Sequence, residues 1–338
     1  MPGAETPVDE DMEDPLFTFG VIADIQYADI DDGYNYVKTR MRYYRNSLWL
    51  LQGAMREWAS ETVTPQFILQ LGDLIDGYNV THKSSETSLK KVLMEIENLK
   101  IPVHHIWGNH EFYNFSRQQL MESILNSSRL PGTSTRFTAD GGDSMDSFYA
   151  YHFSPYPKFR LLLIDSYDFS VIGRDPSSDK HVKSLKFLRQ KNPNEDKNSP
   201  KDLAETRFVQ FNGGISVSQL GWITEVLEES DKNNEKVMVA GHLPVHPSST
   251  DPVCLTWNYL EVLDLLQSHP CVVAYFAGHD HDGGYYQDQC GIHHLTFNGI
   301  IETPPDSQAF GTMYIYEDRM VLRGRGLIPD RTLLYRKS

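Results

Sequence analysis

The chain of 338 residues has few cysteines, few basic residues and no long apolar run. Its 3 cysteines are an odd number and lack the spacing of a metal motif, so we expect reduced thiols in a cytoplasmic protein. No segment approaches the ~20 apolar residues of a membrane span. Residues 1–14 are acidic and lack the apolar centre of a signal peptide. We therefore expect a disordered N-terminal tail and no association with a membrane.

The low content of positive charge argues against a further class of partner. Lysine and arginine number 31 against 46 aspartates and glutamates, and the formal charge is −15. Such a field repels nucleic acids, so none is expected to bind. A phosphate-bearing substrate must instead be attracted locally, by metal ions or by a few arginines. No feature requires an oligomer, and we expect a monomer.

Apolar, strand-like runs alternate with helical patterns along the chain. Strands are expected at 16–23, 67–72 and 101–107, as a hairpin at 148–153 and 159–165, from 237 and 272 onward, and in the tail 293–335. Helices are expected up to about residue 61 and near 84–99, 216–231 and 256–268. This alternation predicts an α/β or α+β sandwich with helices outside the sheets. We expect one domain over 15–338, with a polar surface insertion at about 170–212.

The segment 67–77 is organised around two carboxylates. An apolar run ends at Gly72, and Asp73 and Asp76 follow. A carboxylate has two oxygens and can bind two metal ions at once, which neither a histidine nor an amide can do. By itself the pattern is a weak signal, because strands often end in an acidic turn, in which Asp76 would cap the turn.

Four other predicted strands also end in side chains that bind metals. Side chains two residues apart on a strand share a face, so Asp24 and Gln26 form one ligand pair and His279 and His281 form another. One buried histidine is usually a core residue, but ligand types at five strand ends favour a metal centre. The residues at the other four ends are Asp24 and Gln26, Asn109 and His110, His242, and His279 and His281.

In chain order, the motifs D-x-Q, G-D-x-x-D, G-N-H-E, G-H and G-H-x-H resemble those of the calcineurin-like metallophosphoesterase superfamily. The resemblance spans residues 16 to about 325 and implies a four-layer architecture of two stacked mixed β-sheets flanked by helices. It implies two divalent ions, which roughly 3.5–4 Å apart activate a water for in-line attack on phosphorus. The implied ligands are Asp24, Gln26, Asp73 and His281 for one ion, and Asp73, Asn109, His242 and His279 for the other, with Asp73 bridging.

Gln26 departs from the usual family pattern, which has a histidine at this position. An amide oxygen favours Mn²⁺ or Mg²⁺ over Zn²⁺ or Cu²⁺, so we expect manganese, with magnesium as the alternative. Together with residues 23–27 and 42–45, this departure makes the chain resemble the branch of manganese-dependent ADP-ribose/CDP-alcohol diphosphatases. This implies cleavage of the diphosphate bond in small nucleotides such as ADP-ribose, CDP-choline or CDP-glycerol, which yields a nucleoside monophosphate and a second phosphate compound.

The same resemblance suggests roles for residues around the ions. His110 would stabilise the developing charge or protonate the leaving oxygen. Asp76 would hydrogen-bond His110 and keep it protonated and oriented. Substrate contacts are expected from Arg42 to a phosphate, from Tyr36 or Phe211 to the base, and from His246 and Cys254 in the pocket wall. The alternative is that the arginines pair with acids and the tyrosines pack.

Two other functions are compatible with these motifs. A phosphomonoesterase or a cyclic-nucleotide phosphodiesterase would use the same metal site. A non-catalytic scaffold would normally have lost ligands, whereas every ligand position here holds a competent residue.

Overall fold

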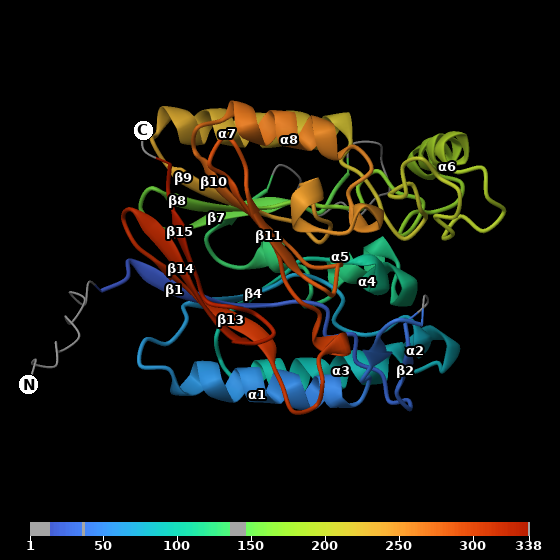
Figure 1. The fold of residues 1–338 in the computed structure, drawn as a ribbon, viewed down its shortest axis with the longest axis horizontal. Helices are drawn as coiled ribbons and strands as arrows, with labels where there is room; N and C mark the ends of the chain where they lie inside the picture. The colour runs from blue at the N-terminus through green and yellow to red at the C-terminus, as the bar shows by residue number, and fades with distance from the viewer. Residues whose placement is uncertain (1–13, 36–37, 136–146, 337–338) are drawn as a thin grey trace, which may run out of the picture.

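The computed structural model describes residues 14–35, 38–135 and 147–336. Two β-sheets are stacked between two layers of helices (Figure 1). This confirms the predicted four-layer α/β sandwich. Residues 1–13 of the predicted tail lie outside the described ranges. None of the helices in those ranges is long and apolar enough to cross a membrane.

The first sheet has six strands, whose central members run parallel. β1 pairs in parallel with β4, β4 pairs in parallel with β5, and β13 closes the other side of β1 in antiparallel register. In spatial order the strands are β15 (Arg331–Leu334), β14 (Arg319–Gly326), β13 (Ala309–Ile315), β1 (Phe17–Ile22), β4 (Phe67–Gln70) and β5 (Val103–His105).

The second sheet has seven strands and is again parallel at its centre. β8, β9, β10 and β12 are mutually parallel, while β7 and β8 form the predicted hairpin. Its order is β11 (Gly284–Gln287), β12 (His293–Thr296), β10 (Val272–Ala277), β9 (Lys236–Ala240), β8 (Phe159–Leu163), β7 (Tyr151–Tyr156) and β6 (Thr133–Ser134). A separate two-stranded ribbon joins β2 (Gly33–Tyr34) to β3 (Met41–Arg42).

Helices cover the outer face of each sheet. α1 (Asn46–Ser60) and α3 (Ser85–Glu97) lie against the six-stranded sheet, and α7 (Val217–Lys232) and α8 (Tyr259–Ser268) lie against the seven-stranded sheet (Figure 1). α1 buries Leu51, Ala54, Met55 and Trp58, the three- and four-residue spacing of one helical face. The shorter helices α2 (Tyr78–Thr81), α4 (Asn109–Asn114) and α5 (Arg117–Glu122) lie at one end of the sandwich.

The main core lies between the two sheets. Phe19 and Phe67 stack there with ring centroids 4.9 Å apart, and Leu161, Leu295 and Met313 pack into the same cluster. Fully burying a side chain of this size stabilises the fold by about 1.5–3 kcal/mol. A second core lies between the seven-stranded sheet and the helices α7 and α8.

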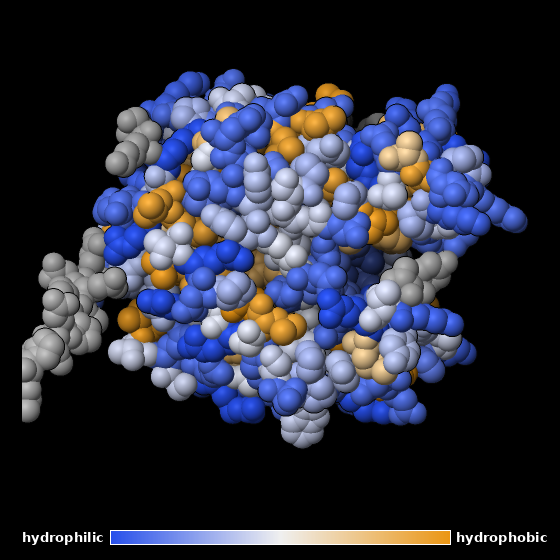
Figure 2. Space-filling view, in the orientation of Figure 1, coloured by the Kyte–Doolittle hydropathy of each residue, from blue (hydrophilic) through white to orange (hydrophobic). Residues whose placement is uncertain are grey.

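The polar segment 170–212, which we predicted to be a surface insertion, has a helix and buried apolar residues of its own. It forms the helix α6 (Asp179–Lys191), and it buries Leu188, Phe208 and Val209 completely or nearly so. Several of its few apolar residues are therefore buried. The polar average composition of the segment gave no sign of them in the sequence. In the space-filling view the surface is hollowed between this segment and the helices opposite it (Figure 2).

Candidate metal centre

Five parallel strands bring the predicted ligands to one edge of the sandwich. β1, β4 and β5 of the first sheet end just before Asp24, Asp73 and Asn109, and β9 and β10 of the second end just before His242 and His279. The carboxyl ends of parallel strands meet at a common edge, which is where α/β folds place their sites. Residues up to 255 positions apart thereby become neighbours.

The first group surrounds His242. Its Nε2 lies 3.4 Å from Oδ2 of Asp73 and 3.3 Å from Oδ1 of Asn109. His279 places Nδ1 3.2 Å from the same Nε2. Ligand atoms of Asp73, His242 and His279 all lie within 4.8 Å of one another, close enough to share one cation.

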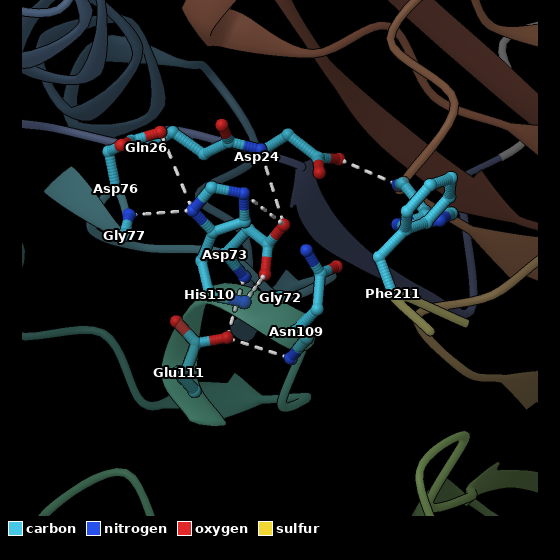
Figure 3. A network of polar contacts seen from close by, with 12 residues as sticks. Asp24, Gln26, Gly72, Asp73, Asp76, Gly77, Asn109, His110, Glu111 and Phe211 are labelled. Carbon is cyan, nitrogen blue, oxygen red and sulfur yellow. Dashed lines mark hydrogen bonds and ion pairs between the residues drawn. The ribbon is translucent and has the colours of Figure 1, made fainter. Parts of the chain in front are cut away.

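The second group lies on the other side of Asp73. His281 places Nε2 3.4 Å from Oδ1 of Asp24 and 3.0 Å from the amide nitrogen of Gln26. That amide nitrogen is also 3.2 Å from Oδ2 of Asp73. Figure 3 shows Asp24, Gln26, Asp73 and His110 within one network of polar contacts. The two groups therefore meet at Asp73, as the bridging role requires.

The backbone is strained at the positions of four predicted ligands. Asp24, Gln26, Asp73 and His279 have φ values of 50°, 43°, 60° and 68°. Non-glycine residues rarely adopt positive φ, and such conformations cost of order 1–3 kcal/mol each. The tight turns aim these side chains inward directly after the strands. The glycine of G-N-H-E is needed for space, because a Cβ at Gly108 would collide with the Asp73 carboxylate.

Two of the histidines are oriented by acceptors behind them. Nδ1 of His242 bonds the carbonyl of Leu71 at 2.7 Å, and Nδ1 of His281 bonds Oε1 of Glu302 at 2.9 Å. Each ring therefore presents Nε2 to the cluster. A partner of this kind fixes the tautomer and raises the basicity of a metal-binding imidazole. Glu302 was not among the predicted residues, because no motif surrounds it.

Glu111 is a second residue that sequence reasoning missed. It is buried, and its carboxylate accepts the backbone N–H groups of Asp73, Leu74 and Gly108, each at 2.7 Å. It therefore joins the G-D and G-N-H-E segments. Its place in the G-N-H-E motif was the available signal.

The charges of the centre shift the pKa values of its histidines. Burial lowers the pKa of His242, but the Asp73 carboxylate raises it by more, so that the resulting pKa is about 9. Burial likewise lowers the pKa of His281, while Asp24 and Glu302 raise it to about 10. Burial and the neighbouring His242 lower the pKa of His279. The carboxylates thus create a potential that attracts positive charge.

The donor atoms fit divalent cations. Among the described residues, Oδ1 of Asp24 and Oε1 of Gln26 are buried without a hydrogen-bond partner. Buried polar atoms are rarely left unpaired, and a cation would satisfy both oxygens. Two carboxylates, two side-chain amides and three imidazoles form a mixed oxygen and nitrogen set, which suits Mn²⁺.

Comparison with known proteins agrees with this geometry. Residues 17–283 match the family model described as calcineurin-like phosphoesterase. The chain belongs to this family.

Several relatives within the calcineurin-like family are similar along the whole chain. A protein of Xenopus tropicalis named manganese-dependent ADP-ribose/CDP-alcohol diphosphatase is 62% identical, with 96% of each chain covered. A human protein of the same name is 53% identical, with 97% of this chain and 95% of the relative covered. The crystal structure of a dimetal phosphatase from Danio rerio matches with a TM-score of 0.88 at 50% identity, covering 96% of this chain and 100% of the other. These findings confirm the resemblance to the family.

The structure brings His110 to the centre but changes its expected contact with Asp76. Nδ1 of His110 accepts the backbone N–H of Gly77 at 2.8 Å, whereas Oδ2 of Asp76 lies 3.4 Å away and makes no hydrogen bond among the described residues (Figure 3). Because the Gly77 N–H occupies Nδ1, Asp76 does not hydrogen-bond the ring as we predicted. Oδ1 of Asp76 instead accepts the backbone N–H of Tyr78 at 2.8 Å, the capping contact named as the alternative.

Arg42 lies beside the family's metal centre but is already paired. Its Nε donates to Oε1 of Glu302 at 3.1 Å, and its Nη1 lies 3.7 Å from Oδ2 of Asp76. Pairing with acids was the alternative interpretation for the arginines. The acids here belong to the site rather than to an exposed helix face.

The other predicted substrate contacts are distributed unevenly. Phe211 packs beside His279, with ring centroids 5.8 Å apart, and thus borders the centre. Burial, with the acids Asp280 and Asp251, raises the pKa of the Cys254 thiol. His246 stacks on Tyr286 and contacts the ring of His294 rather than the predicted ligands. Tyr36 lies outside the described residues.

Proposed function

We propose that this chain is a two-metal hydrolase that cleaves the diphosphate bond of small nucleoside diphosphate compounds. ADP-ribose and CDP-alcohols are the substrates named for its relatives. The observation that carries the proposal is the meeting of seven donor residues around Asp73 at one edge of the sandwich. We propose Asp24, Gln26, Asp73 and His281 as ligands of one ion, and Asp73, Asn109, His242 and His279 as ligands of the other.

The ions would supply what the acidic protein lacks. When bound, they neutralise phosphate charge and activate water for attack on phosphorus. The formal charge of −15 would otherwise repel a diphosphate. Oxygen donors from Gln26 and Asn109 support manganese as the preferred ion, with magnesium as the alternative.

His110 is suited to donate a hydrogen bond that stabilises the charge developing on the leaving oxygen. Since Nδ1 accepts the Gly77 N–H, the proton of the neutral ring lies on Nε2. This Nε2 is 3.9 Å from Oδ2 of Asp73 and therefore faces the metal side. From there it can donate to a phosphate oxygen as the bond to phosphorus breaks.

Arg42 would hold the second phosphate while it keeps its acidic partners. A guanidinium has five N–H donors, and the contacts to Glu302 and Asp76 use two nitrogens. The side chain is 21% exposed, so it can be reached from solvent. Phe211 borders the same centre and would provide an apolar face for the base. Cys254 and Tyr36 complete our proposed set of substrate contacts.

We propose further that the protein is a cytoplasmic monomer that acts on small molecules rather than on nucleic acids. Its three cysteines are free, as a reducing compartment would keep them. The net negative charge disfavours nucleic acids. Sedimentation of the purified protein at two concentrations tests the monomer, since a dimer would raise the measured mass.

A substrate panel tests the activity directly. The protein loaded with Mn²⁺ is incubated with ADP-ribose, CDP-choline, cyclic AMP and p-nitrophenyl phosphate, and an Asp73→Asn variant serves as the metal-site control. We expect AMP and CMP from the first two compounds and far slower turnover of the others. Equal or faster hydrolysis of cyclic AMP or p-nitrophenyl phosphate would replace this proposal with a phosphodiesterase or a phosphomonoesterase. Repeating the panel with Mg²⁺ tests the metal preference.

A further inference from the structure

Asn212 lies at the end of the polar segment and its side chain is fully buried. Its amide nitrogen donates to three backbone carbonyls, those of Arg207 at 2.9 Å, Val253 at 2.7 Å and Leu255 at 3.3 Å. Carbonyl oxygens only accept hydrogen bonds, so the nitrogen side of the amide must face them. These bonds therefore fix the direction in which the amide oxygen points.

The amide oxygen points at a candidate metal ligand. Oδ1 of Asn212 lies 2.8 Å from Nε2 of His279. Because an amide oxygen can only accept, the proton of His279 must be on Nε2. Nδ1 then carries the free electron pair, and this atom lies 3.2 Å from Nε2 of His242 within the cluster that includes Asp73.

We propose that Asn212 is a positioning residue that holds His279 in the tautomer whose Nδ1 binds metal. The inference rests on the proposed function, since it assigns His279 to one of the two ions. The contacts of Leu71 and Glu302 hold His242 and His281 the opposite way, with Nε2 toward the centre. Asn212 also bonds the carbonyls on both sides of Cys254, and thus ties the loop around that thiol to the same histidine.

The chain contains a matched control for this residue. Asn192 is also fully buried, and its amide nitrogen donates to three carbonyls, those of Lys197 at 3.2 Å, Ser199 at 3.3 Å and Phe208 at 2.8 Å. Its side chain bonds only residues 194–208 among those that the structure describes, and none of these is a predicted metal ligand. Asn192→Ala therefore removes a comparable set of hydrogen bonds from the same segment without touching a ligand.

The test measures Mn²⁺ binding rather than activity. Wild type, Asn212→Ala and Asn192→Ala are made metal-free and titrated with Mn²⁺ against a fluorescent chelator. We expect Asn212→Ala to weaken one of the two ions by about 10–100-fold, the usual effect of losing such a partner. Asn192→Ala is expected to bind both ions like wild type. Unchanged binding in Asn212→Ala, or equal weakening in Asn192→Ala, would overturn the proposal.

A second variant separates the acceptor from the fold. Asn212→Asp keeps an oxygen for His279 and loses the donors to the three carbonyls. We expect this variant to melt at a lower temperature but to retain its Mn²⁺ affinity within a few-fold. If Asn212→Ala does not fold, the Mn²⁺ affinity of Asn212→Asp provides the test. ¹⁵N NMR of the metal-free proteins should show the Nε2–H tautomer of His279 in wild type and Asn212→Asp, and a mixture in Asn212→Ala. Lost affinity in Asn212→Asp, or a single Nε2–H tautomer in Asn212→Ala, contradicts the inference. Because no substrate is used, the result stands apart from the substrate panel.

Discussion

The carboxylate of Glu111 receives a 2.7 Å hydrogen bond from the backbone N–H of Asp73, whose φ is +60°. The same carboxylate binds the N–H groups of Leu74 and Gly108. Helix α4 thus holds the strained turn at Asp73, which we propose as the bridging ligand of the metal centre. Glu111 contributes to the site through these three backbone hydrogen bonds.

Glu111→Gln should destabilise the protein. An amide replaces one accepting oxygen with an N–H₂ group that must face a backbone N–H, so at least one buried donor loses its acceptor. We expect a loss of about 1–3 kcal/mol in the free energy of unfolding, measured with urea. Glu228→Gln, the same substitution at an exposed position of α7, is the control. A Glu111→Gln variant as stable as wild type would contradict this account of the turn.

His110→Ala should remove the hydrogen-bond donor to the leaving oxygen while the metal ions remain. Loss of one hydrogen-bond donor to developing negative charge typically costs about 10²–10³-fold in turnover. We expect a fall of this size in kcat for ADP-ribose, with about two Mn²⁺ per chain still measured by atomic emission. His82→Ala, at an exposed position, should change neither quantity. Lost metal, or unchanged turnover, would show that His110 has a different role.

Gln26→His should change the metal preference. The variant replaces an amide oxygen with an imidazole nitrogen, which favours Zn²⁺ relative to Mn²⁺. After loading from an equimolar mixture of the two ions, we expect a higher ratio of bound Zn²⁺ to bound Mn²⁺ than in wild type. Gln52→His on α1 controls for an added histidine outside the centre. An unchanged ratio would mean that Gln26 does not set the preference.

Two buried histidines away from the centre should make the protein sensitive to acid. Burial lowers the pKa of His104 to about 3 and that of His105 to about 4, from an ordinary value of 6.5. The unfolded chain therefore takes up protons first as the pH falls. The stability that these neutral rings contribute is present above pH 6.5 and is lost as the pH falls toward 4.

The prediction is checked by urea unfolding at pH 7, 6 and 5. Below pH 6.5, each such histidine should cost up to about 1.4 kcal/mol per pH unit. His104→Gln should therefore lose less stability than wild type between pH 7 and pH 5. The exposed His82→Gln should follow wild type. Parallel curves for His104→Gln and wild type would refute the assignment.

Much of the centre was predictable because strand geometry is local. Apolar runs that end in glycine and a ligand-type residue locate both the strand and the edge at which it ends, as at Asp73 and His242. Parallel strands then bring these ends together without further information. The family motifs added the pairing of ligands around Asp73.

Other features depended on contacts between distant segments. The polar composition of 170–212 hid Asn212, which lies 67 positions from His279 along the chain. Glu302 lies 21 positions beyond His281 and has no motif of its own. Asp76 was expected to hydrogen-bond His110, but Nδ1 of that ring instead accepts the backbone N–H of Gly77. Such competition depends on ångström-scale differences in position that a residue pattern does not contain.

The sequence by itself determined which chemical groups stand at the ends of the strands, and hence the family and a centre for two cations. Periodicity and side-chain chemistry are sufficient for that, because the ends of parallel strands converge in any sandwich of this kind. The tertiary structure alone decided which nitrogen each histidine presents and which acids surround Arg42. Those outcomes depend on acceptors supplied by remote loops, and only the packing of those loops sets the orientation of an amide or a ring.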